Sequence, residues 1–407
     1  MATRVLLMTQ WFDPEPTFKG IVFARELVRQ GFEVEVVTGF PNYPGGVVYP
    51  GYRIKWLQRE VIDGVHITRL PLYPDHGQSA IKRVLNYASF AASALVYGLF
   101  FARRPAVMYA YHPPLTVGIA AGLIRLIRRI PVVYDIQDMW PDTLRATGMV
   151  NSERALRVVS AVCNWVYRRM DHIAVLSPGF KTLLVQRGVP SDKVEVIYNW
   201  ADEASLSAPS GTVPAAFPEG DAFRIVFAGN MGKAQALDAV LDAALLLQER
   251  QSRVCFVLLG GGVEVTRLQA RASELGLRNV VFLPPVPMQQ VGTLLGAADA
   301  LLVHLRADPL FKITIPSKTQ AYMAVGKPLL MAVDGDAAEL VRDSAGGVVA
   351  ASENAEALAA AAQSLAAMAP EALTEMGDNA RRYYREHLAL EVGVKRFGRL
   401  FHRLAAS

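Results

Sequence analysis

The sequence predicts an α/β protein built from two Rossmann-like, doubly wound domains that face a central cleft. Short β-branched runs alternate with longer helical patterns, and they fall into two series separated by a connector. The composition agrees, because 52% hydrophobic against 19% charged residues over 407 positions is enough for two sizeable cores. Each series therefore predicts a mostly parallel sheet with helices on its faces.

Strands are expected where β-branched and apolar residues cluster. The first half contains the runs Arg4–Met8, Phe32–Val37, Val107–Tyr111, Pro131–Tyr134 and His172–Leu176. The second half contains Arg224–Ala228, Val254–Leu259, Val280–Leu283, Ala300–His304 and Pro328–Met331. The two series predict domains over residues 1–200 and 201–385.

The connector between the series is rich in Ser, Pro, Gly and Ala over residues 190–218, and we expect its hinge near Asn199–Asp202. The helical stretch Pro370–Ala405 is long enough to return to the first half. Residues 386–407 are therefore expected to form a C-terminal helix that crosses back to the first domain.

The charge distribution and the two cysteines indicate which partners and which cellular compartment to expect. Residues 1–200 hold 23 Lys+Arg against 15 Asp+Glu, and the remaining residues hold 19 against 22. A basic half attracts anionic lipid or nucleic acid, but no zinc-finger or ribonucleoprotein pattern favours nucleic acid. Cys163 and Cys255 have neither disulfide-framework nor metal-ligand spacing, and MATRVLLMTQWF lacks a signal-peptide cleavage site. We expect a cytoplasmic protein.

The segment Ile81–Arg104 contains a 19-residue run with no charged residue, VLNYASFAASALVYGLFFA, flanked by Lys82–Arg83 and Arg103–Arg104. Three interpretations remain open: a helix packed within the first domain, an interfacial helix resting in a membrane surface, and a membrane span.

Glycine turns after predicted strands are candidate phosphate-binding sites, because glycine allows close backbone approach and the next helix presents free amides. The first strand leads to Gly20, without the GxGxxG pattern of dinucleotide-binding proteins. The other two turns are Gly229–Gln235, which includes Lys233, and Gly260–Gly262. Each could also be an ordinary strand-to-helix turn.

The segment Ile315–Pro328, IPSKTQAYMAVGKP, gives the strongest signal. It predicts a helix capped by Ser317 or Thr314, with Lys318 in its first turn and with Gly326 and Pro328 at its end. A lysine beside free helix amides favours an anion, and Lys312 just upstream adds positive charge.

Several of these motifs together resemble the retaining GT-B glycosyltransferases of family four. They are IPSKTQAYMAVGKP, the turn GNMGKAQALD at 229–238, VIYNWAD at 196–202, DIQDMWPD at 135–142 and the GGG turn at 260–262. The resemblance covers essentially the whole chain. It is strongest to bacterial transferases of the L-fucosamine and colanic-acid type, which build surface polysaccharides.

This resemblance implies transfer of a sugar with retention of configuration, without a required metal or other cofactor. The first domain would bind the acceptor and the second the nucleotide-sugar donor. The leaving diphosphate would be held by Lys233, Lys312 and Lys318. The remaining donor-binding candidates are Gly20, Gly229, Asn230, Gln235, Gly261, Ser317 and Gln320.

The sequence departs from the family pattern at four positions. The typical Arg and Lys after the turn glycine are replaced by Asn230 and Gln235, with Lys233 between them. Two typical glutamates fall on Ile313 and Ala321, and Gln320 beside the latter is a candidate for the ribose contact.

The catalytic candidates are His112, Asp138 and Lys233. His112 follows a strand directly, and the resemblance places a histidine or small polar residue there, near the transferred sugar. A carboxylate in DIQDMWPD could orient or deprotonate an acceptor hydroxyl, and Asp138 is preferred over Asp135 and Asp142. A structural histidine is the alternative for His112.

The resemblance and the basic first half together predict the partners. The donor would be a nucleotide-sugar, with UDP the commoner nucleotide in this family and an amino or deoxy hexose the sugar. The acceptor would be a polyprenyl-diphosphate-linked saccharide for O-antigen or capsule, held at the inner face of the cell membrane. The alternatives are a UDP-sugar 2-epimerase of the same architecture and a non-catalytic membrane partner of polysaccharide assembly.

Overall fold

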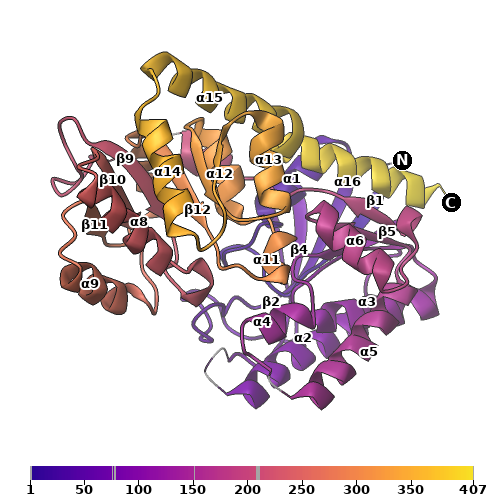
Figure 1. Ribbon diagram of the computed structural model, residues 1–407. Coiled ribbons are helices and arrows are strands. Elements are labelled where there is room, and N and C mark those ends of the chain that lie inside the picture. Colours follow the sequence, from indigo (N-terminus) through magenta and orange to yellow (C-terminus); the bar gives the residue numbers. More distant parts are fainter. Residues whose placement is uncertain (1, 76, 78, 151, 208–210, 407) are drawn as a thin grey trace. The chain divides into compact units, whose positions relative to one another are not determined.

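The structure is a computed structural model that describes residues 2–75, 77, 79–150, 152–207 and 211–406 (Figure 1). The chain divides into two compact units, one of Met1–Tyr198 with Gly393–Ser407 and one of Asn199–Val392. Residues 208–210 of the predicted connector lie outside the described residues. Each unit contains one largely parallel sheet, which confirms the predicted α/β class.

The first unit contains an eight-stranded sheet in the order β3-β4-β2-β1-β5-β6-β7-β8. Its strands are β1 (Arg4–Met8), β2 (Glu33–Gly39), β3 (Gln58–Ile62), β4 (Val65–Leu70), β5 (Val107–Tyr111), β6 (Val132–Ile136), β7 (His172–Val175) and β8 (Val194–Val196). All pairs are parallel except β3 with β4. The sequence analysis missed β3, β4 and β8, because β3 is mostly solvent-exposed, β4 follows it in a hairpin, and β8 spans three residues.

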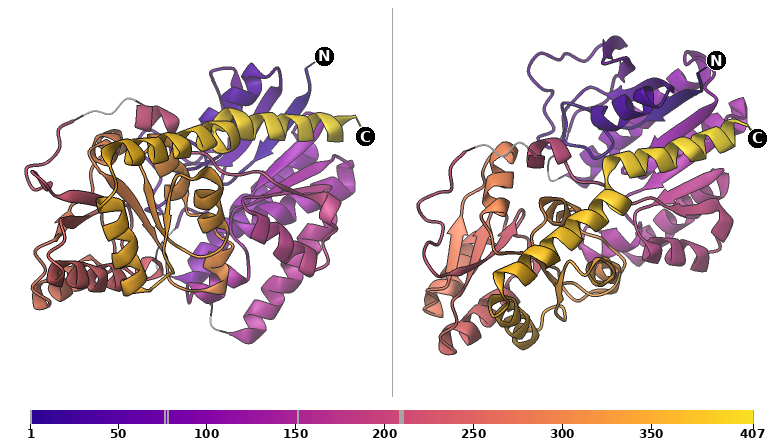
Figure 2. Two further views of the ribbon diagram at one scale, coloured as in Figure 1. Left: turned by 45° about the horizontal axis from the view of Figure 1, so that its top comes forward. Right: turned by 90° about the horizontal axis from the view of Figure 1, so that it is seen from above.

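Helices cover the faces of this sheet. They are α1 (Ile21–Arg29), α2 (Ala80–Phe100), α3 (Leu115–Arg128), α4 (Asp142–Ala146), α5 (Glu153–Arg169), α6 (Pro178–Gln186), the 3-10 turn η1 (Ser191–Lys193) and α16 (Leu390–Ala405). The helices α2, α3 and α5 pack in sequence beside one another (Figure 1). Phe397 of α16 packs its ring against Phe23 of α1 and Tyr109 of β5, so the C-terminal helix contributes to the core of this unit. Figure 2 shows this helix (yellow) beside the first sheet.

The second unit contains a six-stranded, fully parallel sheet in the order β11-β10-β9-β12-β13-β14. Its strands are β9 (Phe223–Ala228), β10 (Val254–Leu259), β11 (Val280–Leu283), β12 (Ala300–His304), β13 (Leu329–Ala332) and β14 (Gly347–Val349). Its helices are α7 (Glu203–Ser207), the 3-10 turn η2 (Lys233–Gln235), α8 (Asp238–Glu249), α9 (Val265–Glu274), α10 (Met288–Gly296), α11 (Pro309–Lys312), α12 (Ser317–Val325), α13 (Asp336–Ser344), α14 (Ala355–Ala366) and α15 (Pro370–Tyr383). Apolar strands such as β10 are buried on both faces, as a parallel sheet requires.

The predicted helical stretch Pro370–Ala405 is not continuous. It comprises α15, a π-helical turn η3 (Tyr384–Leu388) and α16, with Ala389 in an extended conformation between them. Glu203 fixes this break, because its carboxylate accepts hydrogen bonds from the Tyr384 hydroxyl at 2.7 Å and from the Leu390 amide at 2.9 Å. The periodicity of the sequence misses the interruption because the apolar pattern resumes directly after it.

Both sheets have a point where successive connections run in opposite directions, which is where ligands of doubly wound sheets bind. This switch point lies between β1 and β5 in the first unit and between β9 and β12 in the second. Ligand-binding residues are therefore expected in the loops at the carboxyl ends of these four strands.

Within the described residues, no helix combines the length and hydrophobicity that crossing a bilayer requires. Most of Ile81–Arg104 forms α2, which is one of these helices.

Candidate functional site

Two of the predicted glycine turns pack against each other at the ends of β9 and β10. Gly229 and Gly260 have φ angles of +131° and +137°, which other residues rarely adopt. The Gly229 amide donates to the Leu259 carbonyl at 2.8 Å, and the Met231 amide donates to the Gly261 carbonyl at 2.7 Å. A Cβ at Gly260 would lie 2.1 Å from the Gly229 carbonyl oxygen, so only glycine fits at this position.

The helix α12 begins beside these turns without a side-chain cap. Its N-cap is Pro316, so the predicted capping by Ser317 or Thr314 is wrong. Ser317 is the exposed first residue of the helix, and the Thr314 hydroxyl instead donates to the Leu310 carbonyl at 2.8 Å. Uncapped amides in a first helical turn attract an anion.

Lys318 lies across the Gly229 turn. Its Cε and Nζ would be 3.0 and 3.2 Å from a Cβ placed on Gly229, and its Nζ is 3.7 Å from the centroid of the Phe227 ring. No carboxylate in the described part of the chain pairs with this ammonium group, and burial lowers the pKa of Lys318 to about 7. The structure thus brings Lys318 and Gly229 together, as a phosphate site needs.

The other predicted residues of the second unit differ in their surroundings. Asn230, Lys233, Lys312 and Ser317 are exposed, whereas Gln320 is 2% exposed. The side-chain amide of Gln320, oriented to satisfy its hydrogen bonds, donates to the Pro316 carbonyl at 2.9 Å. Gln235 accepts from the Gly232 amide at 2.9 Å and thereby stabilises the turn around Lys233.

Two residues that the sequence analysis did not select support this arrangement. The Tyr322 hydroxyl accepts a hydrogen bond from the Ala228 amide at 2.8 Å and so fixes α12 against the end of β9. His304 ends β12 at the switch point, is 1% exposed, and has its Nδ1 2.7 Å from the Gln235 carbonyl oxygen. Neither residue has a distinctive motif, and their position beside β9 and β12 is visible only once the sheet order is known.

In the first unit, Gly20 serves as the N-cap of α1. The Asp13 carboxylate accepts a hydrogen bond from the Ile21 amide at 2.6 Å, and a Cβ on Gly20 would lie 2.2 Å from the same carboxylate. The α1 N-terminus therefore already has an anionic partner from its own loop. This geometry explains the glycine by local packing.

His112 follows β5 at the switch point of the first unit, as the sequence indicates. It is 2% exposed, and its ring packs edge-on against those of Tyr134 and Trp140. Burial lowers the pKa of His112 to about 3, so the imidazole is neutral at physiological pH. Its Nδ1 is buried without a hydrogen-bond partner among the described residues.

The three aspartates of DIQDMWPD have different surroundings. Asp135 is buried and accepts from the Tyr109 hydroxyl at 2.5 Å and from the Gln137 amide at 2.7 Å. Asp142 forms an ion pair with Arg187. The Asp138 carboxylate has no such partner in the part of the chain described, and burial raises its pKa. Asp138 is therefore the aspartate of this loop whose side chain has no polar partner among the described residues.

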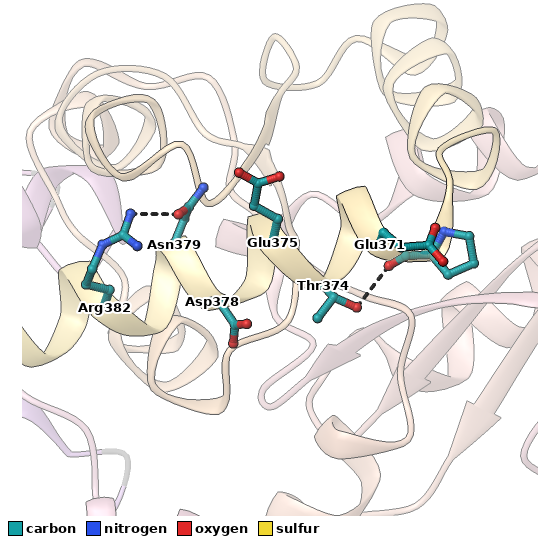
Figure 3. A pocket seen from close by; sticks show the side chains of 7 residues that line it. Glu371, Thr374, Glu375, Asp378, Asn379 and Arg382 are labelled. Carbon is teal, nitrogen blue, oxygen red and sulfur yellow. Dashed lines mark hydrogen bonds between the residues drawn. The ribbon is translucent and has the colours of Figure 1, made fainter.

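Neither a metal-binding group nor a second polar site of this kind adds to these residues among those described. Among the described residues, no group of three His, Cys, Asp or Glu side chains is placed to hold a metal ion. A surface hollow lies along α15 and is lined by polar side chains of that single helix, including Glu375, Asp378 and Arg382 (Figure 3).

Two protein families and two named relatives match this sequence. The family described as "Glycosyl transferase 4-like domain" matches residues 22–200, and "Glycosyl transferases group 1" matches residues 214–383. The putative colanic acid biosynthesis glycosyl transferase WcaI of Escherichia coli is 27% identical over 322 residues, which cover 74% of this chain and 75% of that protein. The probable glycosyltransferase WbjE of Pseudomonas aeruginosa is 24% identical over 237 residues, which cover 57% of this chain and 58% of that protein.

Solved structures share the fold. Sucrose-phosphate synthase of Thermosynechococcus elongatus has a TM-score of 0.75 at 17% identity, with 100% of each chain covered. The Anabaena protein HepE, in complex with UDP and glucose, has a TM-score of 0.69 at 16% identity, with 98% of this chain and 99% of that chain covered. The chain therefore belongs to the group 1 glycosyltransferases of family four, a retaining family with the GT-B fold.

Proposed function

We propose that this enzyme transfers a hexose, an amino or deoxy sugar, from a UDP-sugar to a polyprenyl-diphosphate-linked saccharide during surface-polysaccharide assembly. The donor part of this proposal rests on one observation: the Lys318 ammonium group lies beside Gly229 and the uncapped N-terminus of α12. A departing diphosphate develops negative charge, and fixed positive groups stabilise that charge most strongly where water is scarce.

The residues of the donor site divide into contacts and supports. Lys318, the backbone at Gly229 and Gly261, and the first-turn amide at Ser317 would contact the diphosphate. The exposed side chains of Asn230, Lys233 and Lys312 would reach it from the rim. Gln235 and Gln320 would position the turn and the helix, because their side-chain amides already bind neighbouring backbone groups. UDP is supported by the UDP complex of HepE.

On the acceptor side, His112 and Asp138 would act near the transferred sugar. A neutral imidazole whose Nδ1 has no hydrogen-bond partner among the described residues can bond a sugar hydroxyl without adding charge to the oxocarbenium-like centre. Asp138 would orient or deprotonate the acceptor hydroxyl, and its raised pKa suits a group that accepts a proton.

The helix α2 supports a location at the membrane surface. Along its exposed face run Ile81, Leu85, Val96 and Phe100, with exposed fractions of 74%, 51%, 40% and 76%. Lys82 and Arg83 near its start, and Arg103 and Arg104 just beyond its end, can contact anionic headgroups while the apolar stripe enters the interface. We propose that this face of the enzyme rests on the cytoplasmic leaflet, where a lipid-linked acceptor lies.

The donor half is tested by thermal shift against UDP, GDP, ADP, UDP-sugars and NAD, since a ligand that binds only the folded state raises its apparent stability. We expect stabilisation by UDP and its loss in Lys318→Met. Lys327→Met is the matched control, because Lys327 is a half-buried lysine just beyond the other end of α12.

Two outcomes would overturn the proposal. Stabilisation by NAD alone, or by none of these ligands, would contradict the proposed donor site. Turnover of a UDP-sugar to its 2-epimer without any acceptor would favour the epimerase instead.

A further inference from the structure

Three aromatic side chains meet at the carboxyl ends of β1 and β2, and none of them is among the predicted site residues. Trp11 follows β1, Tyr43 follows β2, and Tyr87 lies on α2. The Trp11 and Tyr43 rings are stacked with centroids 4.6 Å apart, and Tyr87 meets Trp11 edge-on at 6.4 Å. All three are only partly buried, so the cluster combines a fixed packing with access to solvent.

The residue before each of these three rings belongs to a buried polar network. Gln10, Asn42 and Asn86 are each fully buried. The Gln10 amide donates to the Asn86 side-chain oxygen at 2.6 Å, and the Asn86 amide donates to the Tyr73 carbonyl at 2.7 Å and reaches the Asn42 oxygen at 3.3 Å. The Gln10 Oε1 has no hydrogen-bond partner within the described residues. Burying unpaired polar groups costs free energy, whereas a hydrogen-bonded network holds its side chains in one arrangement.

Glu15 fixes the loop that presents Tyr43. Its carboxylate accepts hydrogen bonds from the Asn42 and Tyr43 amides at 2.7 and 2.8 Å and from the Phe12 amide at 3.2 Å. The loop after β1 and the loop after β2 are thereby joined through one buried side chain. The aromatic rings are therefore held in place before any ligand arrives.

Resting on the function proposed above, we propose that Trp11, Tyr43 and Tyr87 form a platform for a pyranose ring of the acceptor saccharide. An aromatic face attracts the C–H face of a sugar, while polar neighbours satisfy its hydroxyl groups. The location agrees with this occupant, because Trp11 follows β1, one of the two strands at the switch point of the first unit.

The platform is tested by saturation-transfer NMR with octyl glycosides of glucose, galactose and N-acetylglucosamine. We expect saturation on ring C–H protons with the native enzyme, and binding weakened about tenfold in Trp11→Ala and in Tyr87→Ala, the scale of one lost aromatic contact. Trp11→Phe should retain most of the binding. Trp56→Ala is the matched control, because Trp56 is a 73% exposed tryptophan of the same unit.

The outcomes separate this inference from the donor proposal. Equal saturation in the native enzyme and both alanine variants, or no ring saturation with any of the three glycosides, would overturn the platform. Saturation of the uridine base that depends on Trp11 would also overturn it, because the rings would then bind nucleotide. UDP-induced stabilisation, measured on the same samples, reports the donor site independently, and urea unfolding verifies that each variant is folded.

Discussion

Lys318 gives the most specific test of the donor site. The buried charge that is proposed to bind the diphosphate also lowers the stability of the free enzyme. Its pKa falls from 10.5 to about 7 through burial, and the ammonium group lies over Phe227 without a carboxylate partner among the described residues. The unfolded chain therefore binds one more proton than the folded chain between these two pKa values. Stability should rise with pH across that window, and the full penalty should be present below pH 7.

The magnitude follows from the same pKa values. Each pH unit corresponds to about 1.4 kcal/mol, which gives an upper bound of about 5 kcal/mol. Partial exposure reduces this figure, and the attraction between the ammonium group and the Phe227 ring offsets about 1 to 2 kcal/mol. We therefore expect Lys318→Met, which keeps the length of the side chain and removes its charge, to stabilise the free enzyme by about 3 kcal/mol near pH 6.

Urea unfolding near pH 6, 8 and 10 measures this effect. The stabilities of Lys318→Met and the native enzyme should converge toward about pH 10. Near pH 6, where the native lysine is charged, the variant should lose UDP-induced stabilisation. Lys233→Met removes an exposed lysine of the same turn region and should leave stability almost unchanged. A variant that is less stable than the native enzyme near pH 6, or equally shifted near pH 6 and 10, would refute this account of Lys318.

Three further predictions concern other parts of the enzyme. Phe100→Ser should weaken flotation with phosphatidylglycerol vesicles by about tenfold or more, because it removes one aromatic side chain that would insert into the membrane surface. Val263→Ser, at an 84% exposed position of the other unit, should not weaken it. Gly260→Ala should lower the free energy of unfolding by about 3 kcal/mol, because of its positive φ and the 2.1 Å approach to a carbonyl oxygen, and unchanged urea unfolding would contradict this. Asp138→Asn should reduce transfer by about 100-fold or more with UDP-induced stabilisation intact, and Asp142→Asn, which removes only the ion pair with Arg187, should retain most activity.

Much of the fold is predictable from the sequence, because buried parallel strands are short apolar runs. Each of the ten predicted strands overlaps an observed one, and Gly326 ends α12 with a φ of +74° as predicted. Four strands of the described chain were missed: β3 and β4, which pair antiparallel at the sheet edge, where β3 has exposed side chains, and β8 and β14, which span three residues each. The break at Ala389 depends on Glu203, which is distant in sequence, and no local pattern reveals such a contact.

The site was less predictable than the fold. Glycine and lysine in a turn indicated an anion site, but the sequence could not separate Lys318, which is largely buried beside Gly229, from the exposed Lys233 and Lys312. The three aspartates of DIQDMWPD were equivalent until their partners were known. The stacked rings of Trp11 and Tyr43 come from two different strand ends, and only the sheet order brings them together.

The most direct test of the central claim is transfer itself. Purified enzyme is incubated with a UDP-sugar, radiolabelled in the sugar, and with bacterial membranes that contain lipid-linked saccharides. Three quantities are measured: the UDP released, the label incorporated into the lipid fraction, and the anomeric configuration of the product. The account predicts label in the lipid fraction, one UDP released per sugar transferred, and the donor's anomeric configuration in the product. Label that remains in an epimerised UDP-sugar, or a product of inverted configuration, would contradict it.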